Sequence, residues 1–135
     1  HNFMPSVGTL EIYRPPSGKY IRVDDGYEEG MEVPIQYDPM LSKLVTFGKT
    51  RNEAIQRMLE AIAKYEVKGV STTLPFGKFV FKHEAFRTGK FDTHFVKQYY
   101  SEDKLKEQMR TEAAVAAKIA LKLYLQDAEL LRLPN

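Results

Sequence analysis

The sequence has 135 residues, 43% of them hydrophobic, which is enough for one domain with its own core and an appendage. Charged residues make up 28% and the formal net charge is only +2, so the composition gives no indication of a nucleic-acid partner. There is no cysteine, which excludes disulfides, thiolate metal ligands and a cysteine nucleophile. No uninterrupted apolar run approaches the roughly 18 residues of a membrane helix, so no membrane partner is predicted.

The chain begins at His1, without an initiator methionine or a signal peptide. We expect it to be a piece cut from a longer protein, in which His1 is left from a tag. The absence of cysteine suits a reducing compartment, and we expect a cytoplasmic protein.

The first quarter of the chain predicts short strands. Residues 9–14 and 20–24 alternate apolar and polar side chains, as half-buried strands do, and Leu10 and Ile12 would share a face. Arg22 would point outward from the second strand. Proline and glycine turns separate these segments, at residues 15–18, 25–26 and 28–30, and a further extended piece covers 31–34. This spacing favours a small antiparallel β unit.

The firmest prediction is a helix in the middle of the sequence. Its apolar residues follow the i, i+3, i+4, i+7 spacing of a one-faced helix: Ile55, Met58, Leu59, Ile62 and Tyr65. Thr50 and Glu53 have the form of a capping box at its start. Gly69 is expected to end it, because glycine adopts the left-handed conformation past a helix C-terminus. Residues 44–47 before the helix are short, apolar and β-prone, and predict a strand.

Smaller elements are predicted next. Residues 70–74 alternate and are interpreted as a strand, and residues 76–83 place their aromatic side chains on one face of a short helix. Residues 88–90 form a turn, and 91–95 begin a last small element.

A long helix is predicted at the end. Ser101 has the character of an N-cap, and nothing breaks the helix from there to about Leu131. Its main apolar stripe is Leu105, Met109, Ala113, Ala116, Ala120, Leu123 and Leu130. We therefore divide the chain into a domain over 1–100 and a helical extension over 101–135.

Few polar residues are candidates for chemistry. The three histidines have no metal-ligand spacing, so no metal site is predicted. Asp38 and Lys43 lie among apolar residues, where a lone charge would be costly. Either they pair, or Asp38 caps backbone amides, or both have a functional role. Arg51 is expected in the first turn of the central helix, in a local salt bridge.

The central stretch fits the pattern P-x-Y-D-x-M-x-x-K-L-x-x-x-G-x-[TN]-R-x-x-A-I-x-x-M, without a gap from its tyrosine onward, at eleven residues: Tyr37, Asp38, Met40, Lys43, Leu44, Gly48, Thr50, Arg51, Ala54, Ile55 and Met58. Pro34 supplies the proline, one residue further from Tyr37 than the pattern has it. This stretch therefore resembles the C-terminal domain of biotin carboxylase, the ATP-dependent component of biotin-dependent carboxylases, whose pattern this is. Further similarity runs from residues 2–6 to the closing pattern at Phe86, Gly89, Asp92, Thr93 and Phe95.

The resemblance implies an α+β fold, with a small antiparallel β barrel-sandwich-like unit, packed helices and, here, the long C-terminal helix. It implies a parent enzyme that activates bicarbonate with ATP and Mg and then carboxylates biotin. In that family the nucleotide-binding and catalytic groups precede the motif N-x-F-x-P-S, and this chain starts at that motif, whose F-x-P-S part it meets at Phe3, Pro5 and Ser6. The chain alone is therefore expected to be inactive, with no cofactor bound. The biotin-bearing A-M-K-M motif is absent from the sequence.

The resemblance also suggests site residues. Asp38 would orient an arginine located upstream of this chain, and Lys43 is the second candidate for a supporting group at the active site. Arg22 would belong to the dimer contact of the parent, or be a solvated strand residue. Thr93 and His94 would lie at the edge of the adenine pocket, or Asp92 and Thr93 would only cap a short helix.

Expected partners are the rest of the biotin carboxylase chain, a biotin carboxyl carrier domain and a carboxyltransferase subunit, within a homodimeric parent. The long helix favours an acetyl- or propionyl-CoA carboxylase, in the cytoplasm or, in a eukaryote, the mitochondrial matrix. Pyruvate and urea carboxylases share the domain and stay open. The alternative is a non-catalytic assembly module that acts through the C-terminal helix, and exposure of the helix stripe would favour it.

Overall fold

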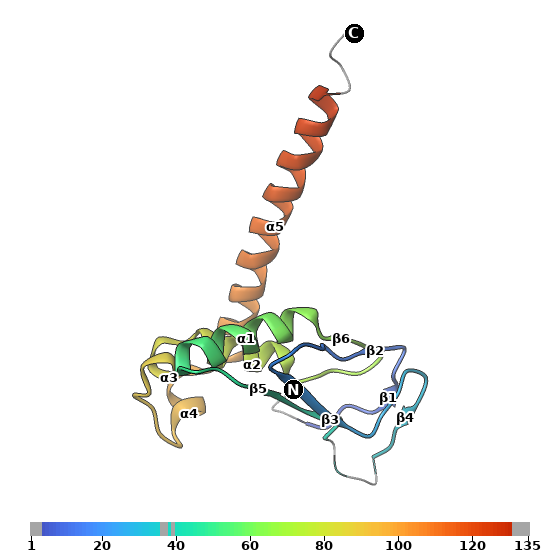
Figure 1. Ribbon diagram of the computed structural model, residues 1–135, viewed down its shortest axis with the longest axis vertical. Helices are drawn as coiled ribbons and strands as arrows, with labels where there is room; N and C mark the ends of the chain where they lie inside the picture. Colours follow the sequence, from blue (N-terminus) through green and yellow to red (C-terminus); the bar gives the residue numbers. More distant parts are fainter. Residues whose placement is uncertain (1–3, 36–37, 39, 131–135) are drawn as a thin grey trace. The chain divides into compact units, whose positions relative to one another are not determined.

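The computed structural model describes residues 4–35, 38 and 40–130, with side-chain exposure for those up to 126. The strands are β1 Gly8–Thr9, β2 Ile12–Arg14, β3 Ile21–Asp25, β4 Glu32–Val33, β5 Ser42–Thr46 and β6 Glu66–Lys68. The helices are α1 Arg51–Lys64, α2 Leu74–Lys82, α3 Glu84–Thr88, α4 Phe95–Tyr99 and α5 Glu102–Leu130 (Figure 1). The chain divides into two compact units, His1–Phe91 (unit 1) and Asp92–Asn135 (unit 2). The predicted division at residue 100 stays a prediction.

The described strands form three two-stranded antiparallel sheets, β1–β4, β2–β6 and β3–β5. The α+β class is confirmed. The longest pairing joins β3 and β5 over five residue pairs, from Ile21 opposite Thr46 to Asp25 opposite Ser42. The predicted strands at 20–24 and 44–47 correspond to these two.

The predicted strand at 9–14 is wrong as a single element, because the chain changes partner at Leu10. The Leu10 backbone N–H donates to Met31 O at 2.9 Å, whereas the next N–H, of Glu11, donates to Lys68 O at 2.9 Å. Leu10 is fully buried at this change of partner. Alternation also mispredicted the buried face of the second half, because Tyr13 is buried and Ile12 is only half-buried.

Helix α1 confirms the central prediction but ends at Lys64, followed by the extended residue Tyr65. Gly69 does not end the helix, as predicted, because Glu66–Lys68 forms β6 in between. Its φ of +97° and its close approach to β1 explain the glycine instead. A Cβ there would lie 1.9 Å from Thr9 O, and no side chain can relieve a clash with backbone.

The predicted strand at 70–74 is also wrong, and helix α2 begins at Leu74. Val70 and Leu74 pack against the core, so the alternation of apolar residues over 70–74 reflects burial of their side chains and not pairing of a strand with a neighbour. Pro75 lies in the first turn of α2, where its missing N–H has no cost. The predicted helix over 76–83 is confirmed within α2.

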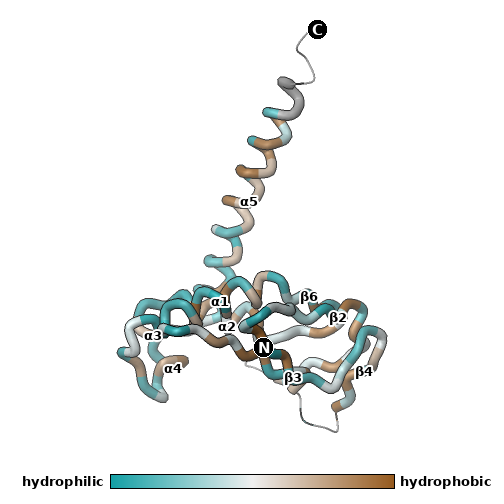
Figure 2. Tube along the Cα trace, viewed as in Figure 1, coloured by the Kyte–Doolittle hydropathy of each residue, from teal (hydrophilic) through white to brown (hydrophobic). Residues whose placement is uncertain are grey.

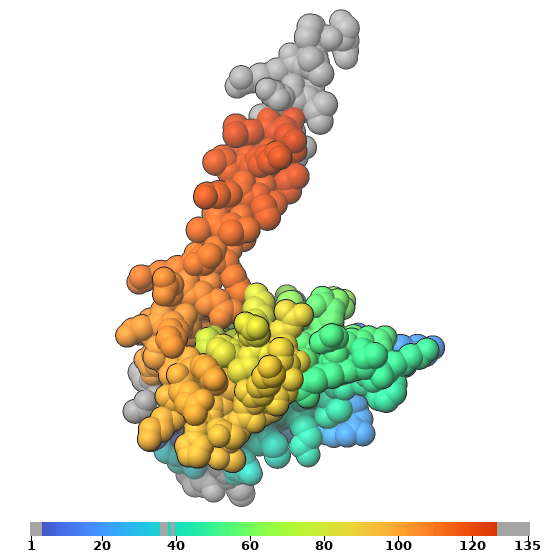
Figure 3. Space-filling model, turned by 90° about the vertical axis from the view of Figure 1, so that its left-hand side faces the viewer, coloured from blue at the N-terminus to red at the C-terminus, as the bar shows by residue number. Residues whose placement is uncertain are grey.

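The core of unit 1 lies between the strand pairs and the helices. Leu10, Tyr13, Val33 and Tyr65 form its buried cluster. Helices α1, α2 and α3 lie side by side, drawn in green to yellow (Figure 3). Gly77 of α2 faces α1, because a Cβ built there would lie 3.6 Å from Ile62 Cδ1.

Unit 2 contains α4 and α5. The predicted N-cap is confirmed, since Ser101 Oγ accepts from the Lys104 backbone N–H at 3.2 Å. Apolar residues recur along α5, brown in Figure 2, and several large ones are each more than half exposed: Met109, Val115, Ile119, Leu121, Leu123, Tyr124 and Leu125. Among the described residues, no helix combines the length and apolar character that crossing a membrane requires.

Removal of residues 101–135 is expected to leave the thermal transition of the remaining chain within a few degrees of the intact chain, because every residue of the buried cluster belongs to unit 1. Differential scanning calorimetry of the two chains makes the comparison. A large fall in the transition temperature would show that α5 contributes to the stability of the core.

Candidate functional site

Two of the predicted site residues lie on one face of the β3–β5 pair. Side chains alternate along a strand, so Arg22 and Asp24 of β3 share a face with Lys43 and Val45 of β5. We call these four residues the outer face. Lys43 lies directly opposite Asp24, and Arg22 opposite Val45. The predicted outward direction of Arg22 is confirmed, and its Nε lies 3.2 Å from Asp24 Oδ1 with the two side chains 70% and 49% exposed.

The apolar surroundings predicted for Asp38 and Lys43 are wrong, because both residues are exposed. Asp38 Oδ1 accepts from the Met40 backbone N–H at 2.9 Å, which is the amide-capping alternative. No ion pair joins Asp38 to Lys43 in the part of the chain that the structure describes. Tyr37 and Pro39 lie outside the described residues. The role of Asp38 in orienting an arginine stays a prediction.

Thr93 and His94 lie at the start of α4, and both are exposed. Asp92 Oδ1 accepts from the His94 backbone N–H at 2.8 Å and lies 3.4 Å from His94 Nδ1. Asp92 O accepts from the Phe95 N–H at 3.1 Å, so Asp92 closes the turn that starts the helix. This is the capping alternative for Asp92, and a place beside an adenine stays a prediction for Thr93 and His94.

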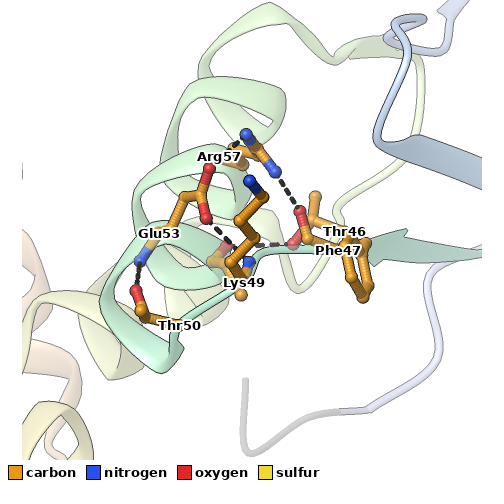
Figure 4. Close-up of polar contacts among 7 residues, drawn as sticks. Thr46, Phe47, Lys49, Thr50, Glu53 and Arg57 are labelled. Carbon is orange, nitrogen blue, oxygen red and sulfur yellow. Dashed lines mark hydrogen bonds and ion pairs between the residues drawn. The ribbon is translucent and has the colours of Figure 1, made fainter.

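A cluster that we call the strand–helix junction connects β5 to α1 (Figure 4). Its residues are Thr46, Phe47, Lys49, Thr50, Glu53 and Arg57. Thr50 Oγ1 accepts from the Glu53 N–H at 3.2 Å, which confirms half of the predicted capping box. The Glu53 carboxylate reaches back one residue further than a capping box requires, to the Lys49 N–H at 2.7 Å.

Arg57 links three parts of this junction. It donates to Phe47 O at 2.6 Å through one terminal nitrogen and to the Glu53 carboxylate through the other. Its guanidinium lies 4.1 Å from the centre of the Tyr20 ring. Gly48 allows the backbone after β5 to pass close to the first turn of α1, because a Cβ at this position would lie 2.4 Å from Ala54 N. Thr46 Oγ1 adds a bond to Ala54 O at 3.0 Å, so the end of β5 is fixed to the first turn of α1.

The predicted local salt bridge of Arg51 is wrong. The Arg51 guanidinium donates to Phe86 O of α3 at 2.6 Å. Its Cζ lies 4.8 Å from the Phe86 ring centre and 6.0 Å from that of Phe91. Arg51 thus contacts a carbonyl oxygen and two aromatic rings in place of the carboxylate of a nearby residue that was predicted. Its hydrogen-bond partner, Phe86, is 35 residues away in the sequence, so the local sequence around Arg51 could not indicate it.

At the opposite end of β3–β5, four side chains form what we call the hydroxyl chain. Tyr13 OH donates to Asp25 Oδ2 at 3.0 Å, and Tyr65 OH donates to Tyr13 OH at 2.8 Å. Ser42 Oγ lies 2.7 Å from Tyr65 OH. Because the single proton of Tyr65 is directed to Tyr13, Ser42 must donate to Tyr65. Every donor therefore points toward one end, the Asp25 carboxylate.

The two tyrosines of the hydroxyl chain are buried, at 7% and 9% exposure, with their rings edge to face at 5.9 Å. Burial raises the pKa of Tyr13 above its ordinary value, and so does the hydrogen bond that Tyr13 donates to the Asp25 carboxylate. Ionised Tyr13 would lose its donor and place a second negative charge beside Asp25. The hydroxyl groups of the hydroxyl chain therefore remain protonated, and the hydroxyl chain acts as a structural connection.

Neither the hydroxyl chain nor the role of Arg57 was predicted from the sequence. A buried tyrosine needs a partner for its hydroxyl, and this requirement at Tyr65 was an available signal. It could not identify Tyr13, 52 residues away. The i, i+4 spacing of Glu53 and Arg57 was a second available signal. Within residues 4–35, 38 and 40–130, no group of three or more His, Asp or Glu side chains could hold a metal ion.

These features define a small α+β domain in which the predicted site residues Arg22 and Lys43 are exposed on one strand pair, and Thr93 and His94 are exposed at the start of a helix. Residues 1–98 match the Biotin carboxylase C-terminal domain family. Biotin carboxylase 1 of Bacillus subtilis (strain 168) is 44% identical over 98 residues, which are 73% of this chain and 22% of that protein. A pyruvate carboxylase subunit of Methanothermobacter thermautotrophicus is 46% identical over the same share of the chain and 20% of that protein.

Solved structures agree. The biotin carboxylase subunit of pyruvate carboxylase is 39% identical with a TM-score of 0.71, over 75% of this chain and 24% of that one. The biotin carboxylase domain of Hydrogenobacter thermophilus 2-oxoglutarate carboxylase is 36% identical with a TM-score of 0.70, over 74% and 23%. The chain belongs to the biotin carboxylase C-terminal domain family. It spans less than a quarter of the length of the relatives it matches, 22% and 20% for the Bacillus and Methanothermobacter proteins.

Replacement of Arg57 by Lys is expected to lower the free energy of unfolding by about 1–2 kcal/mol, although the charge is kept, because a lysine cannot bond Phe47 O and the Glu53 carboxylate in the same fork geometry. Urea denaturation followed by circular dichroism measures the change. Arg14→Lys is the control, since Arg14 makes a 65% exposed ion pair with Glu66 and should cost less than about 0.5 kcal/mol. Equal losses in both variants would contradict the connecting role of Arg57.

Proposed function

We propose that this chain is the closing domain of a biotin carboxylase, where it supplies one wall of the active site and part of the dimer contact. The observation that carries the proposal is the family match over residues 1–98, together with the agreement in fold with biotin carboxylase domains at 36–39% identity. The parent would activate bicarbonate with ATP and then carboxylate the ureido nitrogen of biotin. The chain alone would not turn over.

The proposal assigns ATP, Mg and biotin to the rest of the parent. The Hydrogenobacter relative was crystallised with MgADP, ADP and bicarbonate, which supports a nucleotide and bicarbonate site in the parent of this chain. The catalytic groups of the family precede the residues that match the start of this chain.

Asp38 is the residue that we propose to act nearest the chemistry. It is exposed and lies between β4 and β5 in the sequence, and its Oδ1 accepts from the Met40 N–H. Its second carboxylate oxygen would accept a hydrogen bond from an arginine of the upstream region of the parent. Lys43 would contribute positive charge nearby. Thr93 and His94 would border the adenine.

Arg22 is the residue that we propose for the dimer contact. The outer face carries both signs of charge within a few residues, Arg22 and Lys43 against Asp24. Two copies related by a two-fold axis can therefore place a cation of one opposite a carboxylate of the other. The Hydrogenobacter relative is described as a biotin carboxylase domain dimer, which supports the same arrangement here.

The parent would act with a biotin carboxyl carrier domain and a carboxyltransferase subunit, as an acetyl- or propionyl-CoA carboxylase. Similar proteins include a propionyl-CoA carboxylase alpha chain of Caenorhabditis elegans, 39% identical over 100 residues, which are 73% of this chain and 14% of that protein. Pyruvate carboxylase remains an alternative, given the similarity to the Methanothermobacter protein. We propose a cytoplasmic location, or the mitochondrial matrix in a eukaryote.

A second candidate function is assembly through α5. The seven large apolar side chains of α5 are each more than half exposed (Figure 3, orange to red). Residues 113–125 carry only two charges, Lys118 and Lys122, and are otherwise apolar on most sides of the helix. A helix of that kind is normally buried against other elements. An assembly role through α5 is compatible with the first proposal.

The proposal is tested by replacing Asp38 in the complete carboxylase subunit. Asp38→Ala is expected to lower the rate of biotin carboxylation by about tenfold or more with folding intact, because a misplaced arginine no longer meets the reacting groups. Asp38→Asn is the matched variant, since its side chain can still accept from the Met40 N–H but carries no charge. Both should lose activity.

Wild-type rates in both Asp38 variants would remove Asp38 from the site. Loss in the Ala variant alone would show that the turn, and not the charge, matters. Circular dichroism and thermal unfolding of each variant serve as the control for folding.

A further inference from the structure

We propose that the hydroxyl chain positions the outer face of β3–β5 for contact with a second copy of the domain, which makes Tyr13 and Tyr65 positioning residues of the interface. This inference rests on the interface role proposed for Arg22. The two tyrosines lie inside unit 1, so they would act on the interface through the strand pair.

The pairing register connects the buried bonds to the exposed charges. Asp25 and Ser42, the two ends of the hydroxyl chain, are opposite each other in the last pair of β3–β5. The adjacent pair is Asp24 and Lys43, whose side chains point to the outer face. The two pairs are consecutive along both strands. Hydrogen bonds that hold Asp25 and Ser42 in place therefore also restrict the backbone of Asp24 and Lys43.

The hydroxyl chain also joins two separate sheets. Tyr13 belongs to β2 and pairs with Val67 of β6, and Tyr65 directly precedes β6. The β2–β6 and β3–β5 pairs share no strand. Ser42 binds Tyr65 and Asp25 binds Tyr13, so both strands of the second pair are tied to the first by the two touching hydroxyls.

The other end of β3–β5 has its own attachment. Thr46 Oγ1 and Phe47 O bind Ala54 O and Arg57, in the strand–helix junction. Without the hydroxyl chain, the side-chain hydrogen bonds that attach the strand pair would remain at that end only, beside the apolar contacts of Leu44 with the core. Fraying would then be greatest beside the free end, at the Asp24–Lys43 pair, and smaller at the Arg22–Val45 pair. This gradient distinguishes positioning from a general loss of stability.

Engineered cysteine pairs measure the gradient in the 135-residue chain, which has no cysteine of its own. Asp24→Cys with Lys43→Cys reports the near pair, and Arg22→Cys with Val45→Cys the far pair. The two pairs lie two residues apart, so they are of the same hydrogen-bonding type and any strain in the disulfide is shared. Equilibration with glutathione gives the effective concentration of the thiols in each pair.

Tyr13→Phe and Tyr65→Phe are expected to lower the effective concentration of the near pair by about fivefold, the change that loss of one net hydrogen bond produces, and that of the far pair by less than about twofold. Ile62→Val is the matched control, because it shortens a buried side chain that faces α2. It should lower the urea midpoint to a similar extent and leave both pairs within about twofold of wild type. Asp25→Asn, which keeps an acceptor, should retain more of the near-pair value than Asp25→Ala.

The inference would be overturned if the effective concentration of the near pair were unchanged in both tyrosine variants. It would also be overturned if Ile62→Val lowered that effective concentration as much as the tyrosine variants do. If Tyr13→Phe does not fold, Ser42→Ala removes only the outermost donor and takes its place. The consequence for the interface is measured by dilution of the complete carboxylase subunit without added cysteines. Tyr13→Phe should raise the dimer dissociation constant about fivefold or more, and Ile62→Val should not.

Arg22→Glu separates the two proposals in the dilution experiment. If it leaves the dimer unchanged, the proposed interface is wrong, and the cysteine pairs still decide whether the hydroxyl chain positions the strands. The other informative result is that Arg22→Glu weakens the dimer, while Tyr13→Phe lowers the effective concentration of the near pair but leaves the dimer dissociation constant unchanged. The proposed interface would then stand, and the role of the tyrosines in positioning it would be overturned.

Discussion

The attachment of β3–β5 at both of its ends is the constraint on which the rest of unit 1 depends. At one end the buried hydroxyls of Tyr13 and Tyr65 bind Asp25 and Ser42. At the other end Arg57 ties the end of β5 to α1. A two-stranded sheet is marginally stable by itself, so these attachments, with the apolar contacts of Leu44 to the core, keep its exposed face in a fixed place.

This arrangement suits a domain that completes a larger enzyme. Asp38, Arg22 and Lys43 are exposed, and their polar groups are directed away from the core of unit 1. A solvated charge is inexpensive to maintain in the isolated domain and can pair when another region covers it. The proposed role as a wall and a contact surface of biotin carboxylase therefore requires no catalytic cluster within the described residues. Exposed apolar groups of α5 would serve a different contact.

Local patterns predicted the helices better than the strands. The α1 helix follows from apolar spacing and the Thr50 cap, both of which are local in sequence. Strand partners depend on residues far away, so the break at Leu10 and the β2–β6 pairing could not be foreseen. The sequence context suggested Asp38 and Lys43 as site residues and the family resemblance suggested Arg22, and these roles stay predictions. The apolar neighbours gave the wrong environment for Asp38, because Met40 beside it is itself 57% exposed.

The most direct measurement is bicarbonate-dependent ATP hydrolysis with free biotin, on this chain alone and on the chain mixed with the ATP-binding region of a biotin carboxylase. If the chain is the closing domain, only the mixture is active, and its activity rises with added chain until the ATP-binding region is saturated. Activity of the chain alone would contradict the account, since the chemistry would then reside in residues assigned here to structure and contact. An inactive mixture of two folded, associated parts would contradict it equally.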